Sequence, residues 1–185
     1  MRHDAPASAQ WAISIAAIVL LLMLTASPAA AQVGKGSASF TASNLVKIIS
    51  MEKHLSGAGK EVSVYVMNDP ELTAELQKMV GQSIGQATLK VVAGGTKLPD
   101  NHVDVIYIGN PDDYLFNAAL MQSFLQYTKD NKILSVTHEA MLIYKGVALG
   151  IGSMDGTPKF YINLRTSADT GLDWNKAVIK LAETI

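Results

Sequence analysis

The segment Glu61–Met67 limits the possible folds more than any other part of the chain. Along a β-strand, successive side chains point to opposite faces of the sheet. The valines of this segment would share one face, while Tyr65 and Met67 would share the other. A strand that is apolar on both faces has to be covered on both sides, as in a parallel sheet between two layers of helices. The segment therefore predicts a central strand of an α/β protein.

A helix start follows this strand, and the pairing of strand and helix recurs along the chain. Asp69 can cap a helix, and Pro70 suits the first helical position. Val103–Ile108 is followed by a second such start at Asn110-Pro111-Asp112-Asp113. Alternating strands and helices predict a three-layer α/β sandwich with a largely parallel central sheet and helices on both faces.

The other elements follow from hydrophobic spacing. We expect helices over Ser43–Leu55 and after Pro111, the latter with Phe116, Leu120, Phe124 and Tyr127 along one face. We expect strands at Thr88–Val92 and Ile133–Val136.

The last third of the chain departs from the alternation. Val147–Gly152 and Lys159–Leu164 are predicted strands joined through Asp155-Gly156, a pair typical of tight hairpins. They would add a C-terminal antiparallel hairpin to the sheet. Thr137–Tyr144 fits either a short helix or a lid, and a closing helix capped by Asp173 ends the chain.

The N-terminus carries an apolar run, Trp11–Leu24, that is interrupted only by Ser14. The run is shorter than the ~20 residues of a membrane span but suits the core of a signal peptide. We expect residues 1–31 to be a signal peptide cleaved after Ala31, an uncleaved anchor being the alternative. Residues 32–39 would be a flexible leader, and residues 40–185 a single domain.

Composition excludes several classes of function. The chain has no cysteine, which rules out disulfides, thiolate metal sites and a cysteine nucleophile. Its net charge of -1 gives no basic footprint for nucleic acid.

No catalytic or metal motif stands out. His54, His102 and His138 each lack a second histidine three or four residues away, whereas a zinc site needs three or four converging ligands. There is no G-x-S-x-G sequence, and no glycine spacing fits a phosphate loop. We therefore predict no catalytic residue, metal or cofactor; a hydrolase would need a nucleophile, a base and an oxyanion site in one cleft.

The carboxyl ends of the predicted parallel strands form the candidate ligand site. In open α/β sheets, ligands bind beyond these strand ends. A small polar ligand would meet Asn68, Asp69, Asn110, Thr137, His138 and Glu139 there.

The C-terminal third shows a recognisable order of motifs. Ile133–Thr137 leads through a variable segment to Gly146–Ile151, then to Pro158–Leu164, and finally to Gly171-Leu172 and a helix ending at Leu181-Ala182. This order resembles the YfiR/HmsC-like family of bacterial periplasmic proteins. The chain departs from the family pattern in lacking paired cysteines, in having Ser50-Met51-Glu52-Lys53 after the opening helix, and in having Trp174-Asn175 at the start of the final helix.

The resemblance implies a regulatory protein rather than an enzyme. The best-known family members restrain an inner-membrane diguanylate cyclase by contacting its periplasmic sensor domain, which lowers cyclic di-GMP and biofilm formation. We expect the same here, by a monomer or a homodimer, through an apolar run that comprises Met141, Leu142, Ile143 and Tyr144. The alternative for this run is that it packs on the sheet. The alternative for the function is a periplasmic solute-binding module with its site at the strand ends.

Overall fold

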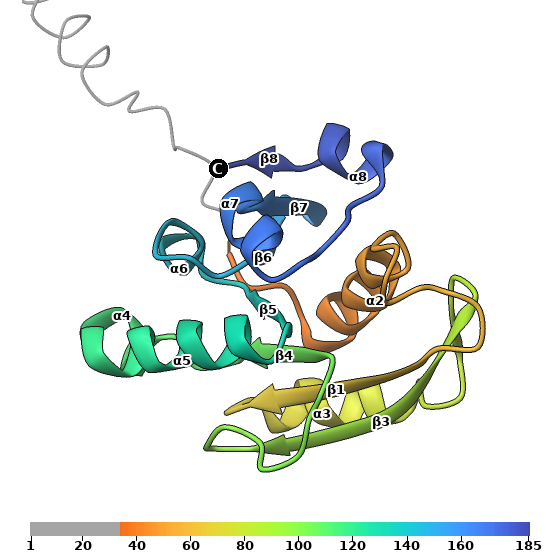
Figure 1. The fold of residues 1–185 in the computed structure, drawn as a ribbon, viewed down its shortest axis with the longest axis horizontal. Helices are drawn as coiled ribbons and strands as arrows, with labels where there is room; N and C mark the ends of the chain where they lie inside the picture. The colour runs from red at the N-terminus through yellow and green to blue at the C-terminus, as the bar shows by residue number, and fades with distance from the viewer. Residues whose placement is uncertain (1–33) are drawn as a thin grey trace, which may run out of the picture. The chain divides into compact units, whose positions relative to one another are not determined.

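The computed structural model describes residues 34–185, so the predicted signal peptide lies outside the described residues. The strands are β1 (Glu61–Met67), β2 (Ser83–Ile84), β3 (Ala87–Gly95), β4 (Val105–Ile108), β5 (Leu134–Thr137), β6 (Leu149–Met154), β7 (Thr157–Ile162) and β8 (Glu183–Thr184). They form one eight-stranded sheet in the order β2-β3-β1-β4-β5-β6-β7-β8 (Figure 1). The pairs β2–β3 and β6–β7 are antiparallel, and the other pairs are parallel. The predicted α/β fold is therefore confirmed.

Helices cover both faces of the sheet. On one face lie α2 (Ala38–Ile49), α3 (Pro70–Gln77) and α8 (Lys176–Leu181). On the other face lie α4 (Asp112–Phe116), α5 (Ala118–Asp130) and α6 (Ala140–Tyr144), and α7 (Leu164–Asp169) follows β7. Among the residues described, no helix is both long and apolar enough to cross a membrane.

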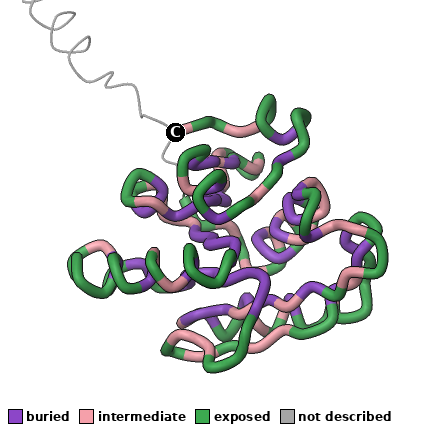
Figure 2. Tube along the Cα trace, viewed as in Figure 1, coloured by how far each residue is buried: buried purple, intermediate pink, exposed green. Residues whose placement is uncertain are grey.

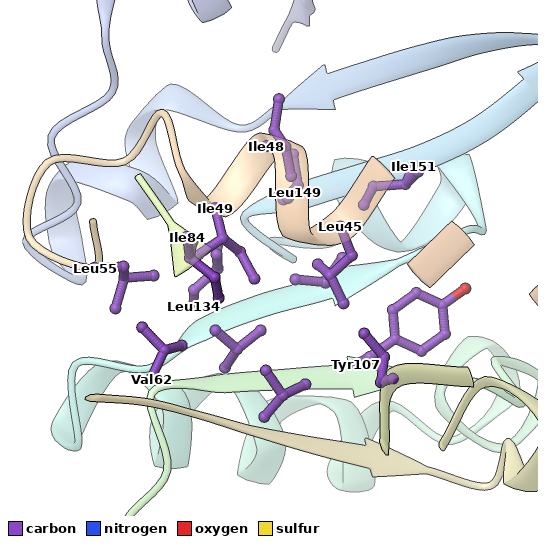
Figure 3. Packing of buried hydrophobic residues seen from close by; sticks show 14 of the residues in the cluster. Leu45, Ile48, Ile49, Leu55, Val62, Ile84, Tyr107, Leu134, Leu149 and Ile151 are labelled. Atoms are coloured by element: carbon purple, nitrogen blue, oxygen red, sulfur yellow. The ribbon is translucent and has the colours of Figure 1, made fainter. Parts of the chain in front are cut away.

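The alternation of side chains along each strand produces two cores. Leu45 and Ile49 of α2 pack above Val62 of β1 and Leu134 of β5 in the first core (Figure 3). Ile106 of β4 points to the second core, which α4, α5 and α6 close. Burial on both faces is what the apolar pattern of β1 required.

The opening helix starts earlier than predicted. Ser37 caps α2 by accepting a hydrogen bond from the Phe40 amide at 3.2 Å. Gly34 exchanges backbone hydrogen bonds with Ser153 of β6, at 3.0 and 2.9 Å. Within the segment expected as a flexible leader, residues 32–39, Ser37 thus serves as a helix cap and Gly34 as an added sheet contact.

A buried carboxylate organises the turn that follows α2. Glu52 is fully buried and accepts hydrogen bonds from the backbone amides of Leu55 and Asp173, both at 2.7 Å. The carboxylate joins this turn to the segment that precedes α8. The predicted helix over Ser43–Leu55 accordingly ends at Ile49.

The single helix predicted after Pro111 is in fact two helices. Asn117 adopts an extended backbone, with φ −112° and ψ 95°, and its side chain accepts a hydrogen bond from the Leu120 amide at 3.0 Å. The cap starts α5 anew and turns Phe116 away from the face that carries Phe124. Phe116 is exposed, whereas Phe124 is buried.

The C-terminal hairpin is confirmed. Asp155 and Gly156 both adopt positive φ, at 51° and 75°, and join β6 to β7. The ambiguous segment after β5 is a short helix, α6. The closing helix is capped by Asn175, which accepts from the Ala177 amide at 2.9 Å, and not by Asp173, which pairs with Lys53.

Candidate functional site

The carboxyl ends of β1, β4 and β5 lie side by side at one edge of the sheet. Met67 pairs in register with Ile108, and Ile108 pairs with Thr137. The polar residues that follow each strand therefore lie along this edge. We call it the carboxyl edge.

Tyr107 and His138 form a contact at this edge. The Tyr107 hydroxyl lies 3.2 Å from Nδ1 of His138, and the two rings stack with their centroids 6.3 Å apart. Burial, together with the nearby charge of Asp69, raises the pKa of Tyr107 well above its ordinary value. The hydroxyl therefore keeps its proton, and it donates to or accepts from Nδ1 according to which imidazole nitrogen carries the proton.

The surroundings of His138 favour its neutral form. Burial lowers its pKa below 6.5, and the charge of Lys35 lowers it further, while Glu139 and Asp69 act in the opposite direction. In a neutral imidazole one ring nitrogen donates a hydrogen bond and the other accepts one.

Asp69 links the carboxyl edge to the N-terminal segment. Its Oδ1 caps α3 by accepting from the Leu72 amide at 3.0 Å, as predicted. Its Oδ2 lies 2.8 Å from Nζ of Lys35, in a charge pair rather than a well-directed hydrogen bond. Asp69 is buried and Lys35 half-exposed. The prediction missed Lys35, because no local pattern distinguishes a lysine of a flexible leader from one held by a sheet contact.

The remaining candidates serve mainly the backbone of their own segments. Asn110 accepts from the Asp112 amide at 3.3 Å, and Thr137 accepts from the Glu139 amide at 3.1 Å. Glu139 caps α6 by accepting from the Met141 amide at 3.1 Å. The carboxyl edge is thus a hydrogen-bonded rim. Within the described chain, no three histidine or acidic side chains gather as a metal site would require.

Asn68 lines a cavity that the other five candidates do not line. This cavity, of about 470 Å³, lies between α3 and β3, and we call it the α3 cavity. Its lining residues are Asn68, Pro70, Thr73, Ala74, Gln77, Gly94, Gly95 and Thr96. Neither Asn110 nor His138 belongs to it, so the six predicted ligand residues do not surround a common cavity there.

A larger cavity, of about 630 Å³, was not predicted. It lies between the strand residues Tyr65, Val91 and Ala93 and the loop of residues 96–103, and we call it the β3–loop cavity. Nothing in the sequence indicates this cavity, since the glycines and the proline of residues 94–99 carry no information about a hollow beneath them.

The predicted partner-binding run divides between core and surface. Leu142 and Ile143 are fully buried, whereas Met141 and Tyr144 are 56% and 60% exposed. Phe116 of α4 is 87% exposed, and α4 contacts α6. Lys145 donates a hydrogen bond to the Leu115 carbonyl at 2.6 Å and so holds the two helices together. We call Phe116, Met141 and Tyr144 the α4–α6 surface; the burial colours of both helices are shown in Figure 2.

The model of the YfiR/HmsC-like family matches residues 40–183. The chain belongs to this family. The resemblance found in the C-terminal motifs is thereby confirmed and extends over residues 40–183. The YfiR/HmsC-like family is periplasmic and regulatory.

Solved structures with this fold are distant in sequence. An ABC domain in complex with L-Trp from Streptococcus pneumonia is 14% identical, with a TM-score of 0.51. A conserved domain protein from Vibrio cholerae O1 biovar El Tor is 13% identical, with a TM-score of 0.50. The matches cover 78% and 81% of this chain but only 60% of each of those chains, and they support the fold alone. No curated protein matches the chain significantly.

Proposed function

We propose that this YfiR/HmsC-like protein is a non-enzymatic periplasmic regulator that binds an inner-membrane signalling protein of the diguanylate cyclase type and restrains it. Family membership supports the regulatory role. Restraint of the cyclase would lower cyclic di-GMP and with it biofilm formation. The observation that carries the proposal is the α4–α6 surface.

The α4–α6 surface has the chemistry of a protein-binding site. Aromatic residues and methionine are enriched at the centres of protein interfaces. Full burial of an exposed phenylalanine such as Phe116, which is 87% exposed, contributes about 1.5–3 kcal/mol. Leu142 and Ile143 anchor α6 in the core, so the exposed residues are presented from a fixed backbone. Such preorganisation lowers the entropy cost of binding.

The alternative function, capture of a small polar ligand at the carboxyl edge, has weaker support. Asn68 lines the α3 cavity without Asn110 or His138. Most of the other polar groups at the edge are engaged by nearby backbone amides.

Deletion of the gene tests the proposal in the bacterium that encodes it. Cyclic di-GMP should rise in the deletion strain and return to its normal level when the wild-type gene is restored. A variant combining Phe116→Ser, Met141→Ser and Tyr144→Ser should fail to restore it, although it should accumulate normally because these side chains lie outside the cores.

Leu181→Ser is the matched control, because Leu181 of α8 is also an exposed apolar residue, at 67%. This variant should restore cyclic di-GMP as the wild type does. Unchanged cyclic di-GMP on deletion would refute the regulatory role, and full activity of the triple variant would refute the role of the α4–α6 surface.

A further inference from the structure

β3 has a free edge along its second half. β2 pairs with β3 only at Ala87 and Thr88, whereas β1 pairs with it as far as Gly95. Over Val91–Gly95, β3 therefore has a strand neighbour on one side only within the described chain, and it borders the sheet in Figure 1. An edge with unpaired backbone groups is a template for a further strand.

Val92 and Gly94 direct their backbone groups to this free side. The Asn68 amide donates to the Gly95 carbonyl at 2.9 Å, so Gly95 faces β1. Because residues alternate along a strand, Ala93 also faces β1, while Val92 and Gly94 face outward. The N–H and C=O groups of both residues are thus placed to pair with another strand.

The second half of β3 lacks the devices that usually protect a sheet edge. Lysines and bulges blunt the edges of natural sheets. Lys90 is such a lysine and lies at the register shift between β1 and β3. From Val91 to Gly95 there is neither a charge nor a second register shift.

The α3 cavity and the β3–loop cavity flank this same edge. Gly94 lines the α3 cavity on one face of the sheet, whereas Val91 and Ala93 line the β3–loop cavity on the other. Thr96 borders both cavities. The side chains of an added strand would point alternately toward the two cavities, which is how sheet-edge binding gains specificity.

Charge indicates what kind of strand fits. From Ala87 to Pro99 the charged residues are Lys90 and Lys97, and Asp100 follows them in the lining of the β3–loop cavity. Lys90 pairs with Glu61 at 2.9 Å, while Lys97 forms no ion pair within the part of the chain that the structure describes. Antiparallel pairing with a second copy would bring Lys90 of each copy close to Lys97 of the other, and like charges across strands are destabilising.

We propose that the free edge of β3 binds an extended segment of another protein as an additional strand. The segment has alternating small or apolar side chains, which enter the two flanking cavities, and an acidic residue that pairs with Lys97. This site is distinct from the α4–α6 surface and does not depend on the proposed regulation of a cyclase.

A labelled peptide tests this proposal. The probe alternates valine and threonine with glutamate at both ends, and its matched control is the same peptide with alternate backbone amides N-methylated. The purified protein should bind the probe and not the N-methylated peptide in fluorescence anisotropy. Val92→Pro removes one outward N–H without touching the pairing with β1, so it should weaken binding about fivefold or more. Val92→Thr keeps the N–H and should bind as the wild type does.

NMR spectra and molar mass complete the test. The amide signals of Val92 and Gly94 should shift on addition of the probe, and both variants should give the spectrum of a folded protein, since Val92 is only partly buried against the first core. Absence of binding, or equal binding by Val92→Pro and the wild type, would overturn the proposal. A wild-type dimer that Val92→Pro dissociates would also overturn it, because a second copy would then be the occupant.

Discussion

His138 illustrates how the fold sets the state of a single side chain. Its Nδ1 lies 3.2 Å from the Tyr107 hydroxyl, and the charge of Lys35, held by Asp69, acts on the imidazole. Burial and this charge both disfavour the protonated form. The residue therefore gives up its proton more readily in the folded protein than in the unfolded chain.

This difference predicts how stability depends on pH. The pKa of His138 is lowered from 6.5 on folding, so below about pH 6.5 the unfolded chain binds a proton that the folded protein does not. The free energy of unfolding should fall from pH 6.5 down to the pKa of folded His138 and level off below it. His138→Gln should remove this part of the fall. Urea unfolding at a series of pH values measures it, and an identical fall in wild type and variant would contradict the assignment.

The sequence predicts the role of a residue where the partner is local. Asp69 was expected to cap a helix, and it does so three residues away, at Leu72. Its charge pair with Lys35 depends on the pairing of Gly34 with Ser153, residues far apart in the chain. Such a contact arises only from the tertiary fold and leaves no local pattern.

At the scale of elements, Asn117 shows why helix boundaries were misjudged. The spacing of apolar residues continues across Asn117, but the residue takes an extended backbone and its side chain caps α5. Asparagine is a weak helix former inside a helix and a strong cap. The break exposes Phe116, which is one of the three residues of the α4–α6 surface.

Replacement of the Asn117 cap should cause a measurable loss of stability. Asn117→Ala leaves the Leu120 amide without its partner and should lower the free energy of unfolding by about 1 kcal/mol. Asn117→Asp keeps the cap and should retain most of that stability. Ser123→Ala, at an exposed position of the same helix, should change little. Equal unfolding midpoints in urea for Asn117→Ala and Ser123→Ala would show that the cap is unimportant.

β3 was predicted shorter than it is for a related reason. The prediction ended the strand at Val92, because Gly94 and Gly95 are typical of loops. In the structure they continue the strand, where a Cβ at Gly94 would lie 2.7 Å from Oγ1 of Thr73 and one at Gly95 would collide with the Tyr65 hydroxyl. Close approach, rather than a turn, accounts for these glycines.

For the whole molecule, the alternation of strands and helices was sufficient to predict the layers but not the surfaces. The apolar faces of β1 predicted a covered, largely parallel sheet, and the carboxyl edge followed from it. The strand order and the two cavities beside β3 depend on tertiary packing. The α4–α6 surface likewise joins residues 116 and 144, which periodicity alone does not bring together.

Site-specific photocrosslinking in living cells tests the central claim most directly. A photoreactive phenylalanine analogue would replace Tyr144 on the α4–α6 surface, with the same replacement at Leu181 of α8 as the control. Irradiation should link the Tyr144 position, and not the Leu181 position, to an inner-membrane protein that mass spectrometry identifies as carrying a diguanylate cyclase domain. Absence of such a protein at position 144, or equal capture at both positions, would contradict the claim.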